Sequence, residues 1–216
     1  MTTLPSIQAA ELDKIKDLYY AQKKHMSQIA GHYNVSIDAV ASFMRRHNLK
    51  RRTPAESNGI NYKRKCPSFK RHLPLNSYER ELEVAGIMLY WAEGYKSIHG
   101  NTVDFANSDP VMIKVFLNFL RTSFVIGETK LRVYLYCYSN QNLQELIRQW
   151  SSICHIPRSQ FSKPYVRTDF NPEQKRKMAL GMIHVRYHDK KLLLEIKNMI
   201  HSYSLSLLNQ QDAPIV

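Results

Sequence analysis

The sequence predicts an α+β protein in which a small three-helix domain precedes a larger domain with helices behind a mostly antiparallel, saddle-shaped sheet. In the first third of the chain, apolar residues recur at helical spacing in three short segments separated by turn residues. In the last two thirds, predicted helices are interspersed with short strands in which apolar and polar residues alternate. We therefore expect a domain over residues 1–52, a basic linker over 53–76, a second domain over 77–204 and a tail over 205–216.

Charge limits the classes of partner. The net charge is +13, and residues 1–73 hold 14 Lys and Arg against 5 Asp and Glu, a net charge of +9. This uneven basic excess favours a polyanion such as nucleic acid. No apolar run is long enough to cross a bilayer and no secretory leader is recognisable, so we expect a cytoplasmic protein. Three isolated cysteines indicate neither a zinc site nor a disulfide framework.

Three short helices are predicted in the first fifty residues, after a loose leader over residues 1–10. They cover Glu11–Ala21, Gln28–Tyr33 and Ile37–Asn48. Ser27 and Ser36 directly precede the second and third helices, where a hydroxyl can cap the helix. Asn34, which tolerates the left-handed region, marks the turn between them. The residues expected to face inward are Leu12, Ile15, Leu18, Tyr19, Ile29, Ala30, Tyr33, Val40, Phe43 and Met44.

These three helices resemble the helix-turn-helix of resolvase-type and other regulatory DNA-binding domains. The resemblance makes Ile37–Asn48 the recognition helix, which would lie in the major groove of double-stranded DNA. Its exposed side would carry Ile37, Asp38, Ala41, Ser42, Arg45 and Arg46. Behind it, Lys50, Arg51 and Arg52 would hold phosphates or enter the minor groove. The alternative is a small helical module that binds protein and has a solvated basic face.

The expected linker contains four prolines and glycines together with the basic runs Lys63-Arg64-Lys65 and Lys70-Arg71. These cations would either be solvated or follow the DNA backbone between two binding domains. Both interpretations predict a segment without fixed structure in the absence of DNA.

The second domain is predicted to open with the helix Glu81–Lys96 and a hairpin over Lys96–Asn107 that turns at His99, Gly100 and Asn101. A helix from Pro110 to about Ser123 follows, with Ser108 or Asp109 as its cap. The remaining elements are the strand Lys130–Tyr138, the helix Gln141–Cys154, the strand Gln160–Arg167, a polar loop over Thr168–Ala179, the strand Met182–His188 and the helix Lys190–Tyr203, capped by Asp189.

Alternation within these strands predicts a sheet with one apolar face, covered by helices, and one open face. The open face would be both basic and aromatic with almost no acid, which fits a saddle lying on nucleic acid. The residues expected to contact DNA from it are Lys130, Arg132, Tyr134, Lys163, Arg167, His184 and Arg186.

The helix Glu81–Lys96 carries an unusual feature at its end. Its apolar run, VAGIMLYWAEG over residues 84–94, finishes in Glu93 and Gly94, and a left-handed Gly94 would stop the helix. The helix dipole disfavours a carboxylate at this end, and a bound cation would relieve the conflict.

This run resembles the signature helix of the LAGLIDADG homing endonucleases. The resemblance implies that Glu93 holds a Mg²⁺ ion that activates water for DNA cleavage, and that two chains pair as a homodimer. Trp91 and Met88 depart from the family's pattern, and Met88 stands where a glycine usually permits close pairing of the helices. Lys96, Lys130, Lys163 or Arg186 would supply a cation beside the acid. Glu93 and Lys96 are the candidate catalytic residues.

Three hypotheses follow. The chain is a Mg²⁺-dependent, site-specific DNA endonuclease acting as a homodimer, or a non-catalytic transcriptional regulator that keeps the same fold, or a DNA-binding protein whose second domain only dimerises. All three predict binding to double-stranded DNA and a location in the cytoplasm with the nucleoid.

Overall fold

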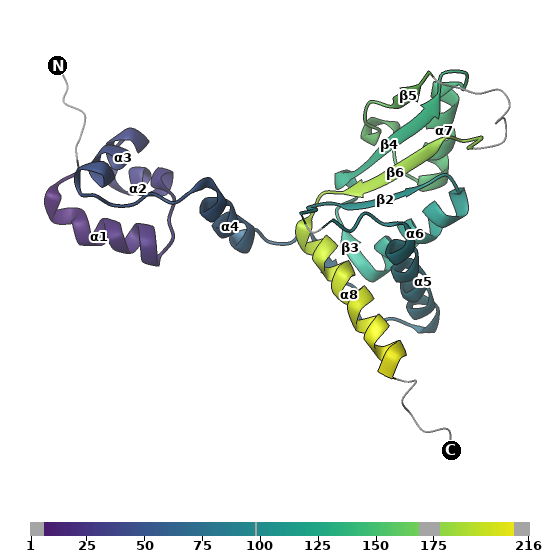
Figure 1. The fold of residues 1–216 in the computed structure, drawn as a ribbon, viewed down its shortest axis with the longest axis horizontal. Helices are drawn as coiled ribbons and strands as arrows, with labels where there is room; N and C mark the ends of the chain where they lie inside the picture. Colours follow the sequence, from purple (N-terminus) through teal and green to yellow (C-terminus); the bar gives the residue numbers. More distant parts are fainter. Residues whose placement is uncertain (1–6, 98, 169–177, 210–216) are drawn as a thin grey trace. The chain divides into compact units, whose positions relative to one another are not determined.

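The computed structural model describes residues 7–97, 99–168 and 178–209. The chain divides into two compact units, Met1–Cys66 and Pro67–Val216, which we describe separately (Figure 1). The expected leader, the loop at Thr168–Ala179 and the tail fall wholly or partly outside the described residues.

The N-terminal unit contains the three predicted helices and a fourth. A 3₁₀ turn, Ala9–Glu11, leads into α1 (Leu12–Lys16), which continues as a π-helical turn over Asp17–Ala21. The next helices are α2 (Met26–Tyr33), α3 (Ile37–Arg46) and α4 (Pro54–Arg64). Eight of the ten residues expected to face inward are buried, namely Ile15, Leu18, Tyr19, Ile29, Ala30, Val40, Phe43 and Met44, whereas Leu12 and Tyr33 are partly buried against them.

The predicted turn between α2 and α3 is confirmed. Asn34 lies in the left-handed region, with φ 50° and ψ 47°. Ser36 caps α3, because its hydroxyl accepts a hydrogen bond from Ala39 N at 3.1 Å. The prediction of Ser27 as the cap of α2 is wrong, since α2 begins at Met26 and its N-cap residue is His25.

The segment predicted to be an unstructured linker is instead structured. The first part of it forms α4, where Thr53 and Glu56 make a capping box around Pro54. Two bonds fasten α4 to the rest of the N-terminal unit. Arg64 Nη2 donates to Gln22 O at 2.7 Å, and Asn61 Oδ1 lies 2.7 Å from His25 Nε2. The helix therefore belongs to this unit.

The second part of the predicted linker belongs to the C-terminal unit. Strand β1 (Phe69–Arg71) pairs with β3 (Phe124–Ile126), a strand that the sequence pattern did not predict. Arg71 Nη1 also donates to Glu83 Oε2 at 2.7 Å. Ser68 donates from its hydroxyl to Asp189 Oδ2 at 2.7 Å, so this segment is fixed at both ends.

The C-terminal unit follows most of the predicted order. It comprises α5 (Ser77–Glu93), β2 (Val103–Asn107), α6 (Pro110–Ser123), the 3₁₀ turn Glu128–Lys130, β4 (Leu131–Tyr138), α7 (Leu143–Cys154), the 3₁₀ turn Arg158–Gln160, β5 (Tyr165–Arg167), β6 (Met182–Tyr187) and α8 (Lys190–Asn209). The predicted caps Asp109 and Asp189 are confirmed, since each accepts backbone N–H bonds at the start of its helix. Helix α5 starts earlier than predicted, because Asn76 caps it. Helix α8 runs through residues 205–209, which were expected to belong to the tail.

The main sheet has the strand order β2-β6-β4-β5. The pairs β2/β6 and β6/β4 are antiparallel and β4/β5 is parallel, so the prediction of a mostly antiparallel sheet is confirmed. The predicted hairpin before β2 is confirmed only in part, because the chain turns back antiparallel but its first arm forms no strand among the described residues. In place of its first strand, the structure has a single bridge between Gly94 and Phe105.

Helices and strands of the C-terminal unit share one apolar core. Its largest fully buried side chains are Trp150, Tyr90, Tyr187, Phe105, Phe116, Phe119 and Phe124. The inward side chains of β4 and β6 alternate strictly with half-buried ones, as predicted. Figure 1 shows the four strands side by side, which leaves one face of the sheet open.

Candidate nucleic-acid interface

Helix α3 presents a basic surface. Ile37 is 48% exposed, and Asp38, Ser42, Arg45 and Arg46 are exposed beside it, whereas Ala41 is half-buried. The α3 side chains that pack inward are Val40, Phe43 and Met44, so burial separates the two sides of the helix as the sequence predicted. The guanidinium groups of Arg45 and Arg46 donate no hydrogen bond to any described residue.

Two of the three cations behind α3 are exposed. The side chains of Lys50 and Arg51 donate no hydrogen bond to a described residue. The backbone oxygen of Lys50 accepts a hydrogen bond from Tyr20 Oη at 2.8 Å. This backbone bond fixes where the two cations emerge after α3.

Arg52 does not fit the predicted role as a phosphate contact. Its guanidinium stacks on the ring of Tyr19, 4.1 Å from the centroid, and donates to the carbonyl oxygens of Lys23 and Lys24. Arg52 N also donates to Tyr19 Oη at 2.8 Å. The charge is used inside the unit, because it joins the segment after α3 to the π-helical turn.

The basic run at the end of α4 also contains one residue bound within the unit and one exposed residue. Arg64 is engaged with Gln22 O, so its predicted DNA contact is not supported by its surroundings. Lys63 is exposed on α4 and donates no hydrogen bond to a described residue.

The open face of the main sheet holds a second group of the predicted residues. Cross-strand pairing puts Asp104, Arg186 and Arg132 in one row and Ala106, His184 and Tyr134 in the next. Arg186 lies over the Tyr134 ring, 4.3 Å from its centroid, and Tyr136 packs against His184 and Tyr165. The predicted basic and aromatic character of this face is therefore present.

The open face also has an acid at its centre, Asp104, although almost no acid was predicted there. Asp104 Oδ1 lies 2.8 Å from His184 Nδ1, and Arg186 Nε donates to Asp104 Oδ2 at 2.7 Å. Burial alone would raise the pKa of Asp104, but the hydrogen bonds and charges of His184 and Arg186 outweigh it, and the pKa is lowered. The sequence signal for this residue was its place in the alternating run Val103-Asp104-Phe105, which puts it opposite the core face.

The remaining predicted contacts surround this row. Arg132 Nη1 donates to the carbonyl oxygens of Thr129 and Leu131, both at 2.7 Å, which turns it back toward its own strand. Lys130 and Lys163 are exposed but precede β4 and β5 and are not on them, contrary to the prediction. Arg167 is exposed on β5, and its guanidinium lies 5.6 Å from the Tyr138 ring centroid.

The end of α5 differs from the prediction in two ways. Gly94 is extended, with φ −74° and ψ 149°, so no left-handed residue stops the helix. Glycine is required there for space, since an added Cβ would lie 2.5 Å from Tyr90 O and from the Tyr90 ring. The second difference concerns Lys96, which was a candidate catalytic residue. Its ammonium group donates to Trp91 O at 2.7 Å and to Gly94 O at 2.8 Å. Lys96 is thus the cation that offsets the helix dipole.

Glu93 itself is exposed and makes no hydrogen bond or ion pair with any described residue. A Mg²⁺ ion requires near-octahedral oxygen ligands. One carboxylate stands here, and two carbonyl oxygens at the same helix end already accept bonds from Lys96. A single chain therefore offers one carboxylate to Mg²⁺, and the other ligands would have to be water, substrate phosphates or groups of a second chain. Among the described residues, no group of three or more His, Cys, Asp or Glu side chains is arranged to hold a metal ion.

No protein-family model matches this chain, and no curated protein or solved structure matches it either. Within residues 7–97, 99–168 and 178–209, none of the helices has the length and apolarity needed to cross a membrane.

Proposed function

We propose that this chain is a sequence-specific double-stranded DNA-binding protein whose recognition helix is α3. The observation that carries the proposal is the exposed side of α3, where Arg45 and Arg46 have no partner among the described residues. Lys50 and Arg51 extend this basic surface just beyond the helix. Long unpaired cations on one side of a helix suit the major groove and the phosphates beside it.

The open face of the main sheet is the proposed second contact. Its Tyr and Arg side chains can lie against a sugar-phosphate backbone, and exposed Lys130, Lys163 and Arg167 surround it. Asp104 reduces the positive charge at its centre, so we expect this face to contribute less to affinity than α3 does.

The experiment is a binding titration against DNA enriched from a random duplex pool, followed by fluorescence anisotropy at several salt concentrations. Replacing Arg45 and Arg46 with Ala should weaken binding at least tenfold. The same change should reduce the slope of log K against log salt by about 2, since about one counterion is released per phosphate contact.

The matched control removes two charges elsewhere. Lys114 on α6 and Arg158 are exposed and were not predicted to contact DNA. If their double Ala variant weakens binding as much as the α3 variant, the attraction depends on net charge and the recognition role of α3 is excluded.

A second candidate function is metal-dependent DNA cleavage by a homodimer. It is favoured by the unpaired carboxylate of Glu93 at the exposed end of α5. The exposed side of α5 also carries Ala85, Trp91 and Ala92, on which a second copy can pack. Pairing would bring a second Glu93 to the site and supply the ligand that one chain lacks.

Cleavage is tested on the same DNA pool with Mg²⁺, using Ca²⁺ as the metal control. Discrete cuts that disappear with Glu93→Gln would assign the nuclease. Enrichment of bound DNA without cuts would favour the non-catalytic alternatives, a transcriptional regulator or a DNA-binding protein whose second domain only dimerises. With either function, we propose that the chain acts in the cytoplasm with the nucleoid.

A further inference from the structure

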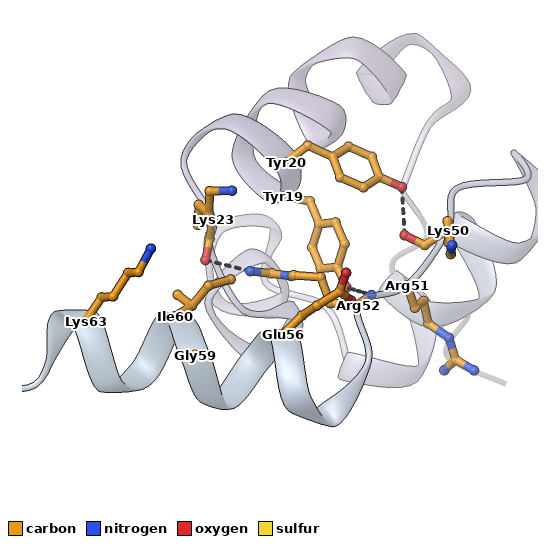
Figure 2. A pocket seen from close by; sticks show the side chains of 10 residues that line it. All are labelled: Tyr19, Tyr20, Lys23, Lys50, Arg51, Arg52, Glu56, Gly59, Ile60 and Lys63. Carbon is orange, nitrogen blue, oxygen red and sulfur yellow. Dashed lines mark hydrogen bonds between the residues drawn. The ribbon is translucent and has the colours of Figure 1, made fainter. Parts of the chain in front are cut away.

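A pocket of about 440 Å³ lies within the N-terminal unit, between the π-helical turn and α4 (Figure 2). Its lining consists of Tyr19, Tyr20, Lys23, Lys50, Arg51, Arg52, Glu56, Gly59, Ile60 and Lys63. The volume is in the range of small-molecule sites. None of the proposed contacts on α3 is part of it, so the pocket is separate from the recognition helix.

The two sides of the pocket differ in chemistry. Figure 2 shows the rings of Tyr19 and Tyr20 on one side and Glu56, Gly59 and Ile60 of α4 on the other. The two rings pack edge to face, with centroids 5.1 Å apart. Tyr19 is buried and its ring is covered by the Arg52 guanidinium, whereas Tyr20 is 41% exposed and offers an aromatic surface to a flat ring.

The charge of the pocket is strongly positive. Lys23, Lys50, Arg51 and Lys63 line it, and none of these side chains donates a hydrogen bond to a described residue. The one carboxylate in the lining, Glu56, already accepts bonds from Thr53 N at 2.7 Å and Thr53 Oγ1 at 3.1 Å. Several unpaired ammonium and guanidinium groups around one cavity favour an anion such as a phosphate.

Arg52 supplies an independent observation. Its Nη atoms are bound to carbonyl oxygens, but its Nε is buried and has no hydrogen-bond partner. Buried N–H groups in native proteins are almost always paired, and an orphan one points to a partner that is absent. The Nε atom is not accessible to solvent, so a ligand oxygen would reach it only after a movement of the Arg52 side chain.

We propose that this pocket binds a free mononucleotide, with the base packed against Tyr20 and the phosphate among the lysines. The ligand would bridge α4 and the π-helical turn, which are joined directly by few bonds. Because Lys50 and Arg51 also belong to the surface proposed to contact DNA, an occupied pocket would weaken DNA binding by withdrawing them.

The test is isothermal titration calorimetry on the full chain without DNA, so its outcome does not depend on the proposed function. The probes are AMP, GMP, CMP and UMP, with adenosine and inorganic phosphate as the two halves of the ligand. We expect saturable binding of at least one mononucleotide, and binding at least tenfold weaker for adenosine and for phosphate.

Binding of none of the probes would overturn the proposal, and so would any of three patterns of binding. Equal binding of phosphate and mononucleotide would indicate a general anion patch, and equal binding of adenosine would remove the role of the lysines. If no free mononucleotide binds but a 5′-phosphorylated dinucleotide does, the pocket serves a DNA strand and not a free ligand.

Two variants place the ligand in this pocket. Lys23→Gln should weaken mononucleotide binding about tenfold, whereas Lys24→Gln, its neighbour outside the lining, should not. Gly59 lines the pocket, so the larger side chain of Gly59→Leu should reduce the space for a ligand. An added Cβ at Gly59 meets no atom within 4 Å, so we expect the fold to be retained. Gly31→Leu on α2 is equally unobstructed and serves as its control. Unchanged binding in both Lys23→Gln and Gly59→Leu would place the nucleotide elsewhere and overturn the proposal.

Discussion

Asp104 on β2 and His184 on β6 meet diagonally across the two strands, with Oδ1 and Nδ1 2.8 Å apart. The other oxygen of the same carboxylate accepts a bond from Arg186 Nε at 2.7 Å. Asp104 is only 9% exposed, so it is a buried acid that orients two basic side chains on the open face of the sheet. A surface predicted from its basic and aromatic residues is thus organised around a carboxylate.

This carboxylate should make the C-terminal unit sensitive to acid. The pKa of Asp104 is lowered in the folded chain, so its contribution to stability is fully present above the pKa of an unfolded Asp, about 4. That contribution should be lost as the pH falls through the lower folded pKa. Urea unfolding at pH 7 should show Asp104→Asn to be about 1–3 kcal/mol less stable than the wild type. The difference should shrink as the pH falls below about 4.

Asp109→Asn is the control for this prediction. Asp109 caps α6 through Val111 N, and Asn caps a helix about as well as Asp does. If the free energies of unfolding of the wild type and Asp104→Asn differ by the same amount across this pH range, the prediction is contradicted. The interaction of Asp104 with His184 and Arg186 would then not depend on the charge of the carboxylate.

Arg51 and Arg52 are adjacent and carry the same charge, yet they should behave oppositely. Arg52→Ala should lower the free energy of unfolding of the N-terminal unit by about 2 kcal/mol, since it removes charged hydrogen bonds and the stack on Tyr19. Arg51→Ala should leave stability unchanged and weaken DNA binding. Thermal unfolding and anisotropy titrations distinguish them. Equal stability of the two variants would contradict the structural role of Arg52.

Gly86 is predicted to be required by the contact between α5 and α6. An added Cβ there would lie 2.1 Å from Phe119 Cγ, and Phe119 is fully buried. Gly86→Ala should therefore cost about 1–3 kcal/mol of stability through overpacking, although alanine favours the helix. Gly31→Ala, where nothing lies within 4 Å of the new Cβ, should instead stabilise by about 0.5–1 kcal/mol. Chemical denaturation of both variants measures this, and a neutral Gly86→Ala would show that the helices can separate freely.

Much of the fold could be predicted because local patterns specify it. The alternation in β4 and β6 identified the two faces of the sheet, and Ser36, Asn34 and Asp189 ended or began helices where their side chains favour it. Helix α4 was missed although Thr53, Pro54 and Glu56 form a recognisable capping box. None of the α4 residues is buried, so the segment lacks the apolar periodicity that identifies a helix from its sequence.

Other features depend on contacts between residues far apart in the chain. Nothing local distinguishes Arg52 from Arg51, and only the position of Tyr19, 33 residues earlier, makes one structural and the other exposed. The pairing of Asp104 with His184 likewise requires the register of β2 on β6. Sequence periodicity predicts which face a residue occupies but not which partner it meets there.

The end of α5 provides the last prediction, because two charges there act in opposite directions. Lys96 donates to Trp91 O and Gly94 O, so Lys96→Met should lower the free energy of unfolding by about 0.5 kcal/mol. Glu93 places a negative charge at the negative end of the same helix. Glu93→Gln should therefore raise the free energy of unfolding by about 0.3 kcal/mol at low ionic strength.

Both effects should shrink in high salt, which screens exposed charges. Urea denaturation at low and high ionic strength measures them, and Glu81→Gln, an exposed acid in an earlier turn of α5, controls for a general effect of removing a carboxylate. A stabilising Glu93→Gln would confirm that the carboxylate opposes the helix dipole. A destabilising Glu93→Gln would mean that the acid has a structural partner, and the case for a metal-binding or catalytic Glu93 would lose its basis.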